Sequence, residues 1–252
     1  MTHASVEQQR ESFNNLVATG TYDAGLRHPA RAERFVTRVI DPLLTERVGQ
    51  TTPVRVLDAG CGPGAWLRLL AARAAAFDVP VRLAGFDVAD RMVEVARTAL
   101  GSTPGLVRIE VADALSPSAY RPLEDGLGFD LVFAYDLIQQ LPRRYQADTI
   151  ARIRDALAPG GAAVVFDHER WSRHGLRMGW RKFATARLGL PLVPRYYCNA
   201  RYPSLARAGA WVGRAEGVAC RIVHSTETPK RALVVRKASV PTGPNAHHAR
   251  KD

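Results

Sequence analysis

Short apolar runs alternate with amphipathic or alanine-rich segments through the middle of the chain. The apolar runs have the length of buried strands, and the segments between them have the length and composition of helices. The predicted strands are Val54–Ala59, Val81–Asp87, Leu106–Ala112, Phe129–Ala134 and Ala162–Asp167, and the predicted helices between them are Ala65–Ala76, Ala89–Leu100 and Arg143–Leu157. Strands that alternate with helices in this way predict a mainly parallel sheet with helices on both faces.

The beginning of the chain departs from this alternation. Residues 1–50 predict a helical N-terminal cap, with one helix over Val6–Ala18 and a second helix that starts at Pro29. Pro42 is expected to divide the second helix or to begin a turn, because proline cannot donate a backbone hydrogen bond.

The end of the chain also differs. Ala219–Ser225 and Ala232–Lys237 are strand-like runs whose connection is too short for a helix, so they either pair antiparallel or lie apart through a long loop. Residues 51–240 therefore predict one α/β domain with a seven-stranded sheet. Residues 241–252 are expected to form a disordered tail.

Composition narrows the class of protein. The chain has 252 residues, of which 46% are hydrophobic and 23% charged, as in an ordinary globular protein. No apolar run reaches the roughly 18 residues that a membrane span needs, and the N-terminal segment lacks the pattern of a signal peptide. The three cysteines, Cys61, Cys198 and Cys220, are too scattered for a disulfide framework or a zinc site. We therefore expect a cytoplasmic protein that binds no metal.

The strongest local motif is VLDAGCGPG, at Val56–Gly64. A buried strand delivers Asp58, and three glycines then turn the chain into a helix. Glycines let backbone N–H groups approach a ligand closely, and the helix N-terminus favours a carboxylate or a phosphate. Alone, the motif also fits a relaxed dinucleotide fingerprint or a purely structural turn.

Two further acidic residues point to a nucleoside site. Asp87 ends the second predicted strand and Asp113 follows the third, and the carboxyl ends of parallel strands are where open sheets bind ligands. Asp87 can accept hydrogen bonds from ribose hydroxyls, and Asp113 can accept one from an adenine amine. Together with the glycine turn, they predict a site for a nucleoside with an attached carboxylate.

In order and spacing, five motifs resemble those of the class I S-adenosylmethionine-dependent methyltransferases, and most closely the small-molecule branch that includes quinone-biosynthesis methyltransferases. The motifs, within Val54–Asp167, are VLDAGCGPG, FDVADRMVEVAR, VADAL, FDLVFAYDLIQQLP and LAPGGAAVVFD. The terminal strand pair resembles the antiparallel sixth and seventh strands of this family. The resemblance implies a Rossmann-like fold with an antiparallel last strand, and S-adenosyl-L-methionine as cofactor.

The resemblance also assigns roles to residues. It implies that Asp58, Gly60 and Gly62 hold the methionine part of the cofactor, that Asp87 binds the ribose, and that Asp113 and Ala114 bind the adenine. With their neighbours, the candidate cofactor residues are Asp58, Gly60, Cys61, Gly62, Gly64, Asp87, Val88, Asp113, Ala114 and Tyr135. The chain lacks the Asn/Asp-Pro-Pro-aromatic motif of enzymes that methylate base amines, and it has no Pro-Cys nucleophile.

The chemistry suggests where catalytic residues lie. Methyl transfer from a sulfonium requires alignment, and a hydroxyl or protonated amine acceptor also requires a base. Glu169 and His168, after the fifth strand, are candidate bases; the alternative is that both are ordinary loop residues. Gln140, where many relatives carry His, is the third catalytic candidate. Gln139 and Gln140 can orient an acceptor or act as a helix cap, and Tyr22 can close over the cofactor or simply pack.

Charge is distributed unevenly along the chain. Residues 1–167 contain 18 arginines and 20 acidic residues, whereas residues 168–252 contain 17 basic and four acidic residues. The excess is concentrated in residues 168–215, a basic insert expected to form the acceptor lid. Within it, Arg173, Arg177 and Arg181 follow one stripe of a helix, and the adjacent apolar stripe contains Leu176, Trp180, Phe183 and Ala184.

Three interpretations of this insert stay open. In the first, its apolar stripe packs on the domain and its arginines face water. In the second, its arginines hold an anionic small-molecule acceptor, and a variant of this interpretation is a basic amphipathic segment at a membrane surface. In the third, its arginines hold RNA. The candidate acceptor-binding residues are Tyr22, Gln139, Arg173, Arg177, Trp180, Arg181, Tyr196 and Tyr197.

The predicted function is methyl transfer to O, N or C of a small, anionic or partly apolar acceptor in specialised metabolism. The alternatives are an RNA methyltransferase, an NAD-dependent oxidoreductase and a cofactor-binding protein without catalysis. The sequence does not predict an oligomeric state.

Overall fold

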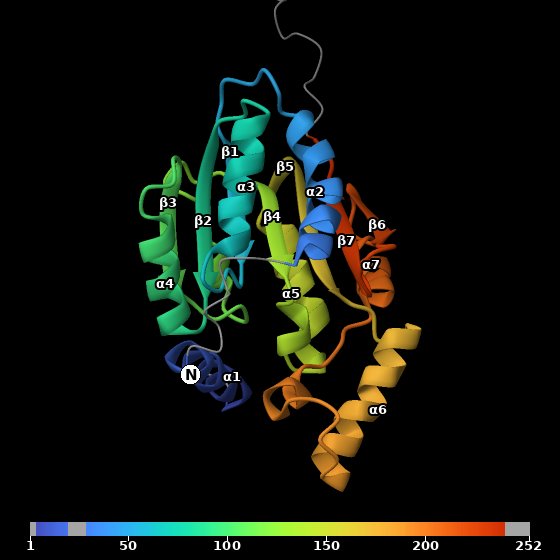
Figure 1. Ribbon diagram of the computed structural model, residues 1–252. Helices are drawn as coiled ribbons and strands as arrows, with labels where there is room; N and C mark the ends of the chain where they lie inside the picture. The colour runs from blue at the N-terminus through green and yellow to red at the C-terminus, as the bar shows by residue number, and fades with distance from the viewer. Residues whose placement is uncertain (1–3, 20–28, 240–252) are drawn as a thin grey trace, which may run out of the picture.

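A computed structural model describes residues 4–19 and 29–239 and shows a seven-stranded sheet with the strand order β3-β2-β1-β4-β5-β7-β6 (Figure 1). The first five strands are parallel, and β7 is inserted antiparallel between β5 and β6. The strands are β1 (Val54–Ala59), β2 (Val81–Asp87), β3 (Leu106–Val111), β4 (Phe129–Tyr135), β5 (Leu157–His168), β6 (Val218–His224) and β7 (Lys230–Lys237). The predicted Rossmann-like sheet with an antiparallel last strand is confirmed.

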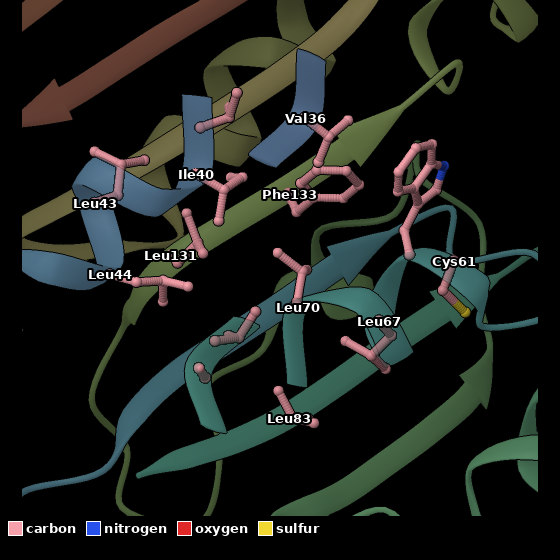
Figure 2. Packing of buried hydrophobic residues seen from close by; sticks show 14 of the residues in the cluster. Val36, Ile40, Leu43, Leu44, Cys61, Leu67, Leu70, Leu83, Leu131 and Phe133 are labelled. Atoms are coloured by element: carbon pink, nitrogen blue, oxygen red, sulfur yellow. The ribbon is translucent and has the colours of Figure 1, made fainter. Parts of the chain in front are cut away.

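Helices cover both faces of the sheet, because side chains alternate between the faces along each strand. On β4, Leu131 and Phe133 point to the face covered by α2 (Ala30–Thr45) and α3 (Ala65–Ala76), and Figure 2 shows them packed against Val36 and Leu70. The other face is covered by α5 (Arg143–Asp155) and α7 (Leu205–Val212). Two apolar cores thus hold the sheet rigid between helical layers.

The remaining helices are α1 (Ala4–Ala18), α4 (Asp90–Leu100), α6 (Arg173–Leu188) and the short 3-10 segments η2 (Pro117–Tyr120), η3 (Ile138–Gln140) and η4 (Arg195–Asn199). Of these, α4 packs along β2 and β3 on the same face as α2 and α3, and α1 and α6 lie beyond the ends of the strands (Figure 1). In Figure 1, α1, η4 and α6 lie at the same end of the molecule. Over the described residues, no helix is both long and apolar enough to cross a membrane.

The course of α2 at Pro42 and the start of β5 differ most from the sequence predictions, and several other boundaries differ by one or two residues. Pro42 does not divide α2, which continues to Thr45. The proline lies in the last turn, where the loss of one backbone hydrogen bond costs little, and its carbonyl accepts a bond from the N–H of Glu46 at 3.3 Å. The strand β5 begins at Leu157 and not at Ala162, and the extra residues shift its register against β4.

The basic insert between β5 and β6 is closed at its base. The backbone N–H of Arg170 donates to the carbonyl of Pro203 at 2.8 Å, so the two ends of the insert lie side by side. Ser172 caps α6 by accepting a hydrogen bond from the N–H of Gly175 at 3.0 Å. A Cβ at position 175 would collide with the backbone carbonyl of Glu169, which explains why this helix starts with a glycine in its first turn.

Candidate active site

A cavity of about 370 Å³ lies at the carboxyl ends of β1, β2, β3 and β4. The strand ends and the turns that follow them form its floor, α1 forms one wall, and η3 and the insert form its far end. The lining residues are Gln9, Ser12, Phe13, Leu16, Gly60, Gly62, Phe86, Asp87, Val88, Met92, Ala112, Asp113, Ala114, Tyr135, Asp136, Leu137, Gln139, Gln140, Leu141, Tyr197 and Ala200. The cavity therefore has two ends. The first lies along β1, β2 and β3 and contains the residues predicted to bind a nucleoside, and the second lies beyond β4.

The turn after β1 requires its glycines. Gly60, Gly62 and Gly64 have φ angles of 74°, 50° and 86°, in the left-handed region that other residues rarely adopt. A Cβ added to Gly62 would have no heavy atom within 4 Å, so the cavity side of this glycine is open. The turn thus leaves backbone accessible to a ligand.

Asp87, at the end of the neighbouring strand β2, stabilises this turn through a hydrogen bond. One carboxylate oxygen accepts the N–H of Gly62 at 2.9 Å, and the other accepts the N–H of Ala89, also at 2.9 Å. Loss of contact with water raises the pKa of Asp87, although these two amide bonds oppose the shift. Asp87 lines the cavity, so its remaining lone pairs can accept hydrogen bonds from a ligand.

Asp58 is the least satisfied polar group at this end. Its side chain is buried, and neither carboxylate oxygen has a hydrogen-bond partner among the described residues. Burial and the nearby charge of Asp87 raise the pKa of Asp58 well above its usual range. A buried carboxylate without partners is unfavourable. Its position beside the glycine turn therefore fits a ligand that brings a hydrogen-bond donor or a positive charge.

Most of the predicted cofactor residues are brought together. Gly60, Gly62, Asp87, Val88, Asp113, Ala114 and Tyr135 line the cavity. Asp58, Cys61 and Gly64 lie directly behind it: Cys61 is buried in the core, and a Cβ at Gly64 would lie 2.6 Å from Leu100. Cys61 and Gly64 therefore pack the turn against the fold, whereas the Asp58 carboxylate makes no hydrogen bond with the described residues.

Sequence analysis missed the contribution of α1. Gln9, Ser12, Phe13 and Leu16 line the cavity from this helix. The sequence showed apolar residues such as Phe13 and Leu16 in the first helix, but it did not indicate which part of the protein they contact. The candidate Tyr22 lies outside the described residues.

The far end of the cavity holds a partly buried ion pair. Asp136, at a φ of 58°, pairs with Lys230 of β7, and the Lys230 ammonium lies 4.6 Å from the centre of the Tyr135 ring. Gln139 is buried beside them; its backbone N–H donates to Asp167 at 2.8 Å, and its side-chain carbonyl oxygen has no partner among the described residues. Gln139 and Gln140 both line this end, as predicted for residues that orient an acceptor.

The two candidate bases do not line the cavity. The rings of His168, His174 and Tyr202 form a cluster, with the ring centre of His168 4.8 Å from that of His174 and 4.6 Å from that of Tyr202. Burial, followed by the charge of Lys230, lowers the pKa of His168 to about 2, so the ring is neutral at physiological pH. Glu169 is buried beneath the insert, where it accepts the N–H of Ala206 at 3.3 Å and lies 3.7 Å from the guanidinium of Arg231.

The orientation of α6 differs from the packing interpretation of the sequence. Leu176, Trp180 and Phe183 are exposed, and of the predicted apolar stripe only Ala184 is buried. Arg173 and Arg177 are exposed as well, and Arg181 donates to the carbonyl of Leu192 at 2.6 Å. Of the insert candidates, Tyr197 lines the cavity; the side chain of Tyr196 lies outside the described residues.

Lys182 occupies the buried side of α6 instead. Its ammonium donates to the carbonyl of Ala200 at 2.8 Å and lies 4.4 and 4.0 Å from the ring centres of Tyr197 and Tyr202. Burial lowers the pKa of Lys182 to about 8. Sequence analysis did not single out this residue, although it is one of only four lysines in a chain with 35 basic residues.

Comparisons with known proteins agree with this geometry. A methyltransferase domain family matches residues 56–161. Trans-aconitate 2-methyltransferase from Methylobacterium nodulans is 31% identical over 172 residues, which cover 68% of this chain and 60% of that protein. The enzyme of the same name from Methylobacterium radiotolerans is 30% identical over 199 residues, which cover 73% of this chain and 70% of that protein. The chain thus spans less than two thirds of the first of these relatives.

The fold has solved counterparts. Magnesium protoporphyrin IX methyltransferase from Synechocystis PCC 6803, solved with bound S-adenosylmethionine, superimposes with a TM-score of 0.62 at 14% sequence identity. The superposition covers 94% of this chain and 99% of the other. At this identity the similarity concerns the fold.

Proposed function

The chain belongs to the class I S-adenosylmethionine-dependent methyltransferases, and from this premise we propose that it methylates a carboxylate oxygen of a small organic acid. The family assignment replaces the alternative of an NAD-dependent oxidoreductase. A cytoplasmic enzyme of specialised metabolism, as the sequence predicts, is part of the proposal.

The first end of the cavity has the features that the cofactor needs. We assign the methionine part to the glycine turn and to Asp58, whose unpartnered carboxylate suits an ammonium group. Asp87 then binds the ribose, and Asp113 with Ala114 binds the adenine. The cofactor supplies an electrophilic methyl group on a sulfonium, and the chain supplies alignment.

The acidic side chains at the far end already have hydrogen-bond or ion-pair partners, and this supports a carboxylate as the acceptor. Asp136 pairs with Lys230, and the two oxygens of Asp167 accept the N–H groups of Gln139 and His168 at 2.8 and 2.7 Å. A hydroxyl or ammonium acceptor must lose a proton to a base, whereas a carboxylate is already ionised at neutral pH. This is the observation that carries the proposal.

The cationic groups favour the same acceptor. Lys182 lies behind Tyr197 and Ala200, and both of these residues line the far end of the cavity. A buried ammonium that is not paired with a carboxylate attracts an anionic ligand. The similar proteins are named for trans-aconitate, which is a carboxylic acid.

The experiment is a product assay on a matched set of acceptors. S-adenosylhomocysteine formation would be measured with trans-aconitate and other di- and tricarboxylic acids, and with the primary amides of the same skeletons. We expect turnover of the acids only, with a methyl ester as product that mild base hydrolyses. Turnover of the amides would contradict the carboxylate acceptor. Turnover of RNA without turnover of the acids would favour an RNA methyltransferase.

A further inference from the structure

Helix α6 is turned with its large apolar side chains away from the protein. Leu176, Trp180 and Phe183 are 56%, 60% and 57% exposed, whereas Lys182 and Met178 are buried. An amphipathic helix ordinarily packs its apolar face on the domain and exposes its charged groups. Here the opposite side chains are buried, so no other part of residues 4–19 and 29–239 covers the apolar face.

Neighbouring residues extend this apolar face at both ends of the helix. Trp171, just before α6, is 55% exposed, and Leu188 and Leu190 at its C-terminal end are 60% and 43% exposed. We call these residues the outer face of α6: Trp171, Leu176, Trp180, Phe183, Leu188 and Leu190. Exposed apolar side chains that occur singly need no explanation, but six between residues 171 and 190, on α6 and directly beside its two ends, indicate an interaction surface.

The charges around the outer face have a single sign. Arg173, Arg177 and Arg187 are exposed on the same helix. Residues 170–215 contain nine arginines, one lysine and no acidic residue. A partner for this surface must therefore provide both an apolar environment and negative charge.

We propose that the outer face of α6 binds the surface of an anionic lipid bilayer. The large apolar side chains would enter the boundary between headgroups and acyl chains, and the arginines would reach lipid phosphates. A second copy of the chain fits less well, because two α6 helices packed face to face would bring arginines together without acidic partners. RNA fits less well too, because leucines form half of the outer face.

This orientation has a consequence for the acceptor end. The chain continues from α6 through η4, and Tyr197 of η4 lines the cavity. Because α6, η4 and α1 lie at one end of the molecule (Figure 1), bilayer binding would bring this end of the enzyme to the lipid surface.

The test is binding of the whole chain to vesicles. Cosedimentation would be measured with vesicles of phosphatidylcholine alone and with vesicles of phosphatidylcholine and phosphatidylglycerol in equal amounts. We expect binding to the mixed vesicles, and at least about tenfold weaker partitioning for the double variant Leu176→Gln/Phe183→Gln, because each large apolar side chain contributes strongly when buried. Arg173→Gln/Arg177→Gln should also weaken binding to the mixed vesicles.

A matched control removes two equally exposed apolar side chains elsewhere. Val48 and Leu127 are 54% and 58% exposed and do not belong to the outer face. Val48→Gln/Leu127→Gln should bind mixed vesicles like the unaltered chain. Equal binding by the Leu176→Gln/Phe183→Gln variant, or no vesicle binding at all, would overturn the proposal. Self-association or RNA binding that this variant abolishes, without vesicle binding, would overturn it in favour of those partners.

Discussion

The side-chain amide of Asn14 on α1 donates to the carboxylate of Asp90 on α4, with 2.6 Å between nitrogen and oxygen. Arg10 donates to the same oxygen at 3.2 Å, and the side-chain Oδ1 of Asn14 accepts the backbone N–H of Arg91 at 3.2 Å. One carboxylate at the start of α4 thus fastens the helix that forms a wall of the cavity. The hydrogen bonds from Asn14 and Arg10 lower the pKa of Asp90.

Asp90→Ala should loosen α1 and weaken cofactor binding. We expect about a fivefold loss of affinity for S-adenosylhomocysteine, measured by calorimetric titration, because these contacts are partly exposed and screened by water. Because the pKa of Asp90 lies below 3.8, the contacts hold at neutral pH and are lost only as pH falls through the lowered value. Asp90→Asn, which keeps an acceptor for Asn14, should lose less; unchanged affinity in Asp90→Ala would show that α1 does not contribute to binding.

Asp58→Asn should stabilise the ligand-free protein and weaken its binding of the cofactor. The neutral amide removes the cost of burying an unpartnered carboxylate, so the ligand-free melting temperature should rise by about 2–4 °C. The raised pKa means that ionised Asp58 destabilises the folded state increasingly as pH rises above 3.8, and the variant should lose this dependence. Affinity for S-adenosylmethionine should fall at least about tenfold. Asp87→Ala is the contrasting variant, because it breaks two backbone contacts and should lower both quantities.

Lys182 should make acceptor binding depend on pH. Its ammonium is charged below its pKa of about 8, so the KM for an acidic acceptor should rise as pH increases through this value while the acceptor itself stays ionised. Lys182→Met should raise the KM at pH 7 by about tenfold or more and abolish the dependence. Lys237→Met is the matched control: Lys237 also donates to a backbone carbonyl, that of Leu157 at 2.9 Å, but Leu157 does not line the cavity, whereas Ala200, the partner of Lys182, does. A pH profile that survives in Lys182→Met would remove Lys182 from acceptor binding.

Glu169→Gln distinguishes a general base from a supporting residue. If the acceptor is a carboxylate, kcat should stay within about threefold of the unaltered enzyme, whereas loss of a general base typically costs about a hundredfold or more. The partial loss of the contact with Arg231 should appear as a lower melting temperature. A large fall in kcat with an unchanged melting temperature would instead support Glu169 as the base.

The candidate cofactor residues at the strand ends could be predicted from the sequence because all of them follow parallel strands. The turn at Gly60–Gly64 and the residues Asp87 and Asp113 each follow a parallel strand, and parallel strands end at one edge of a sheet. Local sequence therefore determined which side chains share the cavity before any tertiary contact was known.

The orientation of α6 and the role of Lys182 were not predictable in the same way. Periodicity identifies the residues that share a helix face, but it does not identify which face another segment covers. The chain after α6 folds back, and Leu192 accepts a hydrogen bond from Arg181, which buries the polar side of the helix. The strand β5 ends at His168, one residue later than predicted, and Glu169 follows it; the distance of both residues from the cavity depends on how the insert packs over them.

The contact between Arg170 and Pro203 bears on how this enzyme could change its acceptor over evolution. Because Arg170, just after β5, and Pro203, just before α7, are joined by a backbone hydrogen bond, loss or replacement of the segment between them requires only a short new connection and no rearrangement of the strands. Residues 171–202 form a segment that can be exchanged as a unit. This segment includes Lys182 and Tyr197 but no residue of the glycine turn. In the proposed acceptor site, the contribution of Lys182 and Tyr197 can therefore change without any change in the glycine turn, while Gln139 and Gln140, which lie outside this segment, stay in place.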